Sequence, residues 1–140
     1  MMRTAPQPSG WRLRPAIAAG LTLSFYPSFR ICPSLQALEE RIANEMPEYG
    51  RFGIHVMASQ NGAGEVTIGD SHEYGNSISI FDKSAIDRLI LDYLGGFLDL
   101  PDPLPAEHWH GAYVKHPNLP YFSASPEPGL LVITGFGGAA

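Results

Sequence analysis

The chain has 140 residues, 44% of them hydrophobic and 16% charged, and this composition suits a single globular domain, residues 1–140, with a buried core. Its net charge is −5 and no segment concentrates Lys and Arg, which argues against nucleic acid as a partner. No run approaches the roughly 20 apolar residues of a membrane span, so we expect none. Cys32 is the only cysteine, which excludes an internal disulfide and favours a cytoplasmic location.

The first predicted helix follows an irregular, strand-rich segment, residues 1–29, in which a run over 18–25 partly alternates. Pro33 occupies a position typical of a first helical turn, and Leu35, Leu38 and Ile42 then recur every three or four residues. This spacing predicts an amphipathic helix over 34–46.

A β-hairpin is predicted next, because two runs of β-type residues flank Asn61-Gly62, a strong signal for a two-residue turn. We place its strands at 53–59 and 65–71. Such a turn pairs Gln60 with Ala63 and sets His55 opposite Ile68.

The second half of the chain contains one more predicted helix, over 83–98, whose apolar stripe includes Ile86, Ile90 and Leu94. Alternation predicts a strand over 108–115, and the apolar, β-branched run 130–134 predicts a buried strand. We therefore expect an α+β fold, with all four predicted strands in one antiparallel sheet and both helices packed on it.

Two clusters of polar residues suggest chemistry on their own. His108 and His110 would share one face of a strand, as a metal-binding pair does, but no further ligand follows at a suitable spacing, so a metal-binding β domain is only a third alternative. The segment GDSHEYG sets Asp70, Ser71 and His72 side by side. Adjacent strand residues point to opposite faces and no G-x-S-x-G elbow occurs, so we reject a hydrolase relay.

The stretch WHGAYVKHPNLPYFSASPEPGLLVITGFGGA, near the end of the chain, carries a more specific pattern. It resembles the C-terminal part of the D-amino-acid oxidase and glycine oxidase superfamily of FAD-dependent amine oxidoreductases. There, a strand with W-x-G-x-R-P leads through a proline-rich turn to a strand ending in T-G-H-G-G, which lies against the flavin. The resemblance implies that Thr134, Gly135, Gly137 and Gly138 contact the cofactor.

The resemblance covers nearly the whole chain, because GIHVMASQNGAGEVTIGD matches the strand pair of the family's substrate domain. GDSHEYG looks like a branch encoded alongside organophosphonate-degrading enzymes. This implies oxidation of a small primary or secondary amine of the aminoethylphosphonate type, by hydride transfer to flavin. It also implies the family's substrate-domain fold.

The family's dinucleotide-binding domain has no counterpart here, since no G-x-G-x-x-G follows a strand. We therefore expect a truncated substrate domain that cannot hold FAD alone and is inactive without a flavin-domain chain. The alternative partner to a flavin-domain chain is a further copy of this chain, in a homo-oligomer. The alternative function is a non-catalytic α+β binding or subunit module without flavin.

Three residues are implied as the substrate wall. His55 and His72 match pocket positions of the family, and the predicted hairpin register also puts them on one face. Tyr113 stands where the family usually carries an arginine that binds the substrate carboxylate. Because a phenol cannot replace a forked guanidinium, an ordinary amino-acid substrate is disfavoured. Lys115 would share the face of Tyr113 and could offer a positive charge, although a solvated lysine is the favoured interpretation.

Overall fold

The computed structural model describes residues 1–77, 79–116, 118–119 and 121–135. The chain divides into two compact units, Met1–His110 and Gly111–Ala140, which we describe separately. The described residues form an α+β structure, mainly antiparallel, with a five-stranded sheet and four α-helices. None of the described helices has the length and apolar character needed to cross a membrane.

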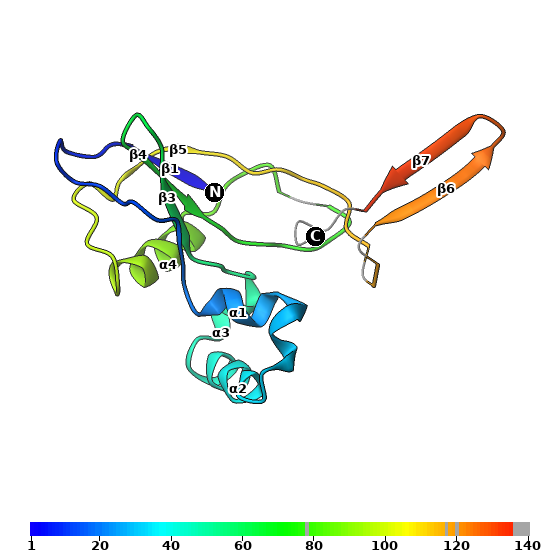
Figure 1. Cartoon of the computed structure of the whole chain (residues 1–140), viewed down its shortest axis with the longest axis horizontal. Helices are drawn as coiled ribbons and strands as arrows, with labels where there is room; N and C mark the ends of the chain where they lie inside the picture. Colours follow the sequence, from blue (N-terminus) through cyan, green and yellow to red (C-terminus); the bar gives the residue numbers. More distant parts are fainter. Residues whose placement is uncertain (78, 117, 120, 136–140) are drawn as a thin grey trace. The chain divides into compact units, whose positions relative to one another are not determined.

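The first unit is built on a five-stranded sheet in the order β2-β3-β4-β1-β5, in which every strand pair is antiparallel. The strands are β1 (Met2–Pro6), β2 (Ile17–Ala18), β3 (Met57–Gln60), β4 (Glu65–Gly69) and β5 (Pro105–His108). Figure 1 shows α4 (Ser84–Gly95) beside this sheet and the other helices gathered apart from it.

Strand β1 lies between β4 and β5, although its sequence, MRTAP, gave no prediction of a central strand. Met2 and Thr4 are buried, while Arg3 between them faces out and forms ion pairs with Glu65 on β4 and Glu107 on β5. Those two carboxylates raise the pKa of Arg3, chiefly through its hydrogen bond to Glu107. The alternation is therefore real but too short to be recognised in a polar segment.

The core of the first unit lies between the sheet and α4. Its fully buried side chains come from β1, β4, α4 and the segment before β3, and include Met2, Val56, Val66, Ile68, Ile90 and Leu94. The predicted stripe of the 83–98 helix is thus confirmed in α4, which begins and ends within three residues of the predicted bounds.

Helix α2 (Leu35–Glu45) agrees with the predicted helix over 34–46, but it does not pack on the sheet as we expected. It contacts α1 (Leu21–Phe25) and α3 (Pro47–Arg51), and only Leu35 of its apolar stripe is buried. Exposed pairs four residues apart, such as Arg41 with Glu45 at 2.9 Å, support the helix locally. The strand-like alternation predicted over 18–25 is wrong for residues 21–25, which are helical. A 3-10 helix, η1 (Pro27–Ile31), follows them.

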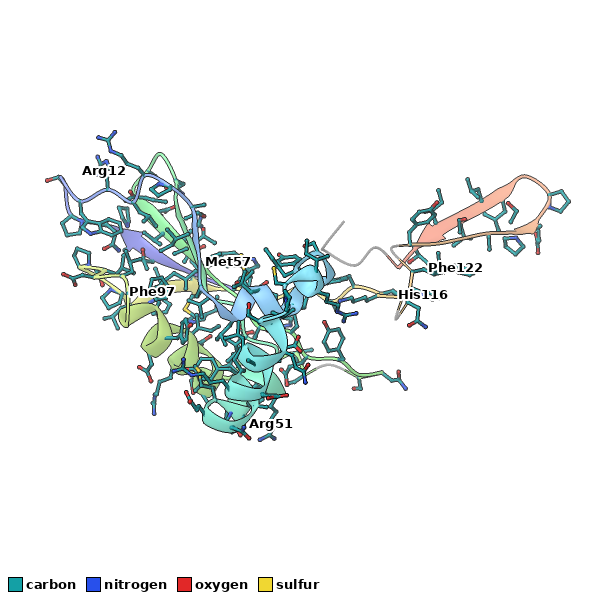
Figure 2. All side chains as sticks on the ribbon, turned by 60° about the horizontal axis from the view of Figure 1, so that its bottom comes forward. Arg12, Arg51, Met57, Phe97, His116 and Phe122 are labelled. Atoms are coloured by element: carbon teal, nitrogen blue, oxygen red, sulfur yellow. The ribbon has the colours of Figure 1, made fainter. Side chains whose placement is uncertain are left out.

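The second unit contains a separate two-stranded sheet, β6 (Phe122–Glu127) paired with β7 (Leu130–Thr134). The prediction that 130–134 joins the main sheet as a buried strand is therefore wrong, and Ile133 at its centre is 50% exposed. The cause is local: Glu127 pairs with Leu130 across Pro128-Gly129, and Gly129 has φ of +85°. A short turn closes a hairpin at lower entropic cost than a distant pairing does. Figure 2 shows the labelled Phe122 and His116 at the base of this hairpin, where their rings stack.

Candidate functional site

The candidate site lies where the chain enters and leaves the β3–β4 hairpin. The predicted strands 53–59 and 65–71 were too long, since β3 begins at Met57 and β4 ends at Gly69. The main chain continues the pairing beyond them nonetheless. The amide of His55 donates to the carbonyl of Asp70 at 2.8 Å, and the amide of His72 donates to that of Phe52 at 2.9 Å. These bonds fix the backbone from which both histidines project.

The hairpin register differs from the predicted one. Gln60 pairs with Val66 instead of Ala63, and Ala58, instead of His55, lies opposite Ile68. The side chain of Asn61 causes the difference, because its Oδ1 accepts hydrogen bonds from the amides of Ala63 and Glu65 at 3.0 and 3.1 Å. The side chain thus organises a four-residue loop, 61–64, in place of the expected two-residue turn.

His55 and His72 lie together despite this shift, with their ring centroids 5.1 Å apart. His55 is 3% exposed, whereas the side chain of His72 keeps 19% of its surface open. A ring nitrogen of His72, Nδ1, is 3.4 Å from the carbonyl oxygen of Gly53. The two histidines therefore differ in role: one belongs to the interior and the other can meet a ligand.

Asp70 gives the site a negative charge. Its Oδ2 is 3.8 Å from Nε2 of His72, and its side chain is 22% exposed. The other oxygen, Oδ1, is buried and accepts no hydrogen bond from the described residues. A carboxylate oxygen without a donor is costly to bury.

Phe25, at the end of α1, covers both imidazoles. Its ring centroid is 3.9 Å from that of His55 at 73° and 5.1 Å from that of His72 at 30°. Tyr26 adds an edge contact to His55 at 6.1 Å. Asp70, His72, His55 and Phe25 together are called the imidazole site below.

Sequence reasoning missed Asp70 and Phe25 as members of this site. Asp70 had a usable signal, because residues two apart on an extended segment share a face, which brings Asp70 and His72 together. Phe25 had none, since its segment was interpreted as irregular and strand-rich and its helix is only five residues long.

His108 and His110 do not act as a pair. His108 is the last residue of β5, so the strand alternation that would align His110 with it ends there. Nε2 of His108 is 3.1 Å from Asp87, and Nδ1 of His110 is 2.8 Å from Asp82. In the part of the chain that the structure describes, no group of three or more His, Cys, Asp or Glu side chains could hold a metal ion.

Tyr113 and Lys115 belong to the second unit and are exposed there. Residues 111–116 form no strand, so the predicted strand over 108–115 is wrong beyond His108. The alternation that put Tyr113 and Lys115 on one face therefore has no basis.

The predicted flavin-contacting loop begins as expected, with Thr134 as the last residue of β7 and Gly135 turning the chain at φ of +78°. A Cβ on Gly135 would lie 3.4 Å from the backbone nitrogen and Cβ of His116, so the glycine accommodates a neighbouring segment of the chain. Gly137 and Gly138 lie outside the described residues.

Comparison with protein-family models, with curated proteins and with solved structures gives no match to this chain.

Proposed function

We propose that this chain forms the substrate-binding part of an FAD-dependent oxidoreductase that acts on a small primary or secondary amine of the aminoethylphosphonate type. The observation that carries the proposal is the partly exposed pair of Asp70 and His72, 3.8 Å apart, beside the buried His55. The sequence resemblance that selects His55 and His72 as pocket residues supports the same assignment.

The two partly exposed groups suit a zwitterionic ligand. The Asp70 carboxylate, whose side chain is 22% exposed, attracts the ammonium group of an aminophosphonate. His72 can bind the anionic end when its imidazole is protonated. A ligand that carries only one of these charges would leave one of the two groups unmatched.

Tyr113 supports the choice of a substrate other than an ordinary amino acid. A guanidinium at its position would bind a planar carboxylate through two parallel hydrogen bonds, whereas a phenol donates only one. Placing the anion on His72 removes the need for that arginine. In this proposal the flavin is seated by a partner domain, and the chain itself binds and orients the amine.

Amine-dependent reduction of flavin tests the proposal. The chain alone with added FAD should not oxidise aminoethylphosphonate, its N-methyl derivative, glycine or D-alanine, because no G-x-G-x-x-G follows a strand in the sequence to bind the diphosphate. Joined to a flavin-binding domain of the D-amino-acid oxidase type, the protein should lose its visible flavin absorbance anaerobically when an aminophosphonate is added.

Matched variants locate the site in that assay. Asp70→Asn and His72→Ala should each weaken turnover about tenfold or more, because a contact to a charged group is worth roughly 1.5–3 kcal/mol. His108→Ala, whose side chain pairs with Asp87 instead, should retain activity. Full activity in the Asp70 and His72 variants, with loss in the His108 variant, contradicts the assignment. A flavin-free protein that still binds the amine would instead be a non-catalytic binding module.

A further inference from the structure

The ring of Phe25 makes the two histidines unequal. The Phe25 ring contacts that of His55 at 3.9 Å between centroids, and it also lies at 30° to the His72 ring. His55 is 3% exposed beneath it, while His72 and Asp70 keep about a fifth of their side-chain surface open. A ligand that approaches the imidazole site thus meets His72 and Asp70 but not His55.

Phe25 is anchored by the residues that precede it in α1. Earlier in α1, Leu21 and Thr22 are buried, and Ser24 donates to the carbonyl of Leu21 at 2.9 Å. Beyond Phe25 the chain becomes extended at Tyr26 before η1 begins. The ring therefore sits at the end of an anchored turn, where a smaller side chain opens the site with little change to the core.

We propose that Phe25 is the specificity-determining residue of the imidazole site: its ring closes the side over His55 and limits the ligand to the space beside His72 and Asp70. His55 is then a positioning residue, which supports His72 from behind and does not touch the ligand. The role of Phe25 in ligand specificity rests on the proposed function. The shielding of His55 by Phe25 does not depend on flavin or on amine turnover.

Chemical modification of the folded chain tests the shielding. Diethyl pyrocarbonate transfers its ethoxycarbonyl group to a neutral imidazole nitrogen, and peptide mass spectrometry reports the rate at each of the five histidines. In the wild-type chain we expect His72 to react and His55 to stay unmodified. In Phe25→Ala, His55 should react at a rate comparable with that of His72.

Three controls distinguish local exposure of His55 from a general loss of structure. Phe29→Ala, a change on η1 whose ring stacks on neither histidine in the described part of the chain, should leave His55 protected. Phe25→Leu keeps apolar volume without a flat ring and should give an intermediate rate if Phe25→Ala does not fold. Urea unfolding of each variant, followed by circular dichroism, identifies general loosening, because His108 and His110 are already exposed in the folded chain and serve only as a reference for reagent reactivity.

The outcomes separate this inference from the proposed function. It is overturned if His55 reacts as fast as His72 in the wild-type chain, or stays protected in folded variants at Phe25. Methylphosphonate should slow modification of His72 by occupying the site. If methylphosphonate changes no rate, the anion-binding role in the proposed function is contradicted, while the His55 rates still decide the role of Phe25.

Discussion

Tyr49 illustrates how a single half-buried side chain joins two helices. From α3 its hydroxyl donates to the carbonyl of Leu89 on α4 at 3.1 Å, and its ring contacts that of Tyr93 at 5.7 Å. Burial raises the pKa of the Tyr49 phenol, with smaller contributions from Asp92 and Tyr93. The hydroxyl is thus bound in its neutral form, which gives the contact a pH dependence.

The free energy of unfolding should reveal this dependence. Because the folded chain holds the Tyr49 proton more tightly than the unfolded chain, stability falls as pH rises above about 10, the ordinary pKa of tyrosine. Tyr49→Phe should lose about 1 kcal/mol at neutral pH through the missing hydrogen bond and should show a weaker decline at alkaline pH. Urea unfolding at both pH values measures this. Tyr113→Phe, at an exposed position, is the control, and an alkaline decline unchanged by Tyr49→Phe would contradict the account.

The same scale shows which site residues a sequence can reveal. His55 and His72 were predicted to lie on one face, and their rings lie 5.1 Å apart, but the register used to place them was wrong. Side chains two residues apart still share a face when the hairpin register shifts, provided that the main chain forms new hydrogen bonds across the two segments. The backbone hydrogen bonds between His55 and Asp70 are of this kind. Phe25 could not be predicted, because a ring stacked across 30 or more positions of sequence leaves no periodic signal.

Among the elements, strands β4 (EVTIG) and β7 (LLVIT) both contain β-branched residues but have different surroundings. Ile68 on β4 is fully buried between β3 and β1, whereas Ile133 on β7 is half exposed. Periodicity and β-branching identified both strands. Burial could not be predicted from them, because it depends on whether a neighbouring segment or a distant one pairs with the strand.

Truncation of these two residues should therefore have unequal effects. Ile68→Ala should lower the free energy of unfolding by about 2–5 kcal/mol, since it removes a fully buried side chain and leaves a cavity. Ile133→Ala, the same change in β7, should cost about 0.5 kcal/mol or less. Urea unfolding followed by circular dichroism compares them. A large loss from Ile133→Ala would show that β7 is buried against another segment.

Amide hydrogen exchange extends the comparison to whole strands. Within the described residues, β6 and β7 pair only with each other, and an isolated two-stranded hairpin is at best marginally stable in water. Amides of β6 and β7 should therefore exchange much faster than those of β4, which is paired on both sides. Equal protection of the two sheets, measured by nuclear magnetic resonance (NMR), would contradict this view.

For the whole molecule, the fold class follows from period changes along the sequence, which correctly indicate helices near 34–46 and 83–98 and an antiparallel sheet. The division into two units was not indicated, because both halves alternate in similar ways. The charge balance provides a functional clue at this scale: with a net charge of −5, a phosphonate would need a local positive group, and a protonated His72 supplies one.

The central claim is that Asp70 and His72 bind a small zwitterionic aminophosphonate. It is tested most directly by titrating the chain with 2-aminoethylphosphonate while NMR follows the ring signals of its five histidines. The account predicts a saturable shift of the His72 signal and unchanged signals for His108 and His116. Asp70→Asn should weaken the apparent affinity about tenfold, as expected for loss of a contact between charged groups. A His72 signal that stays fixed at saturating ligand would contradict the account.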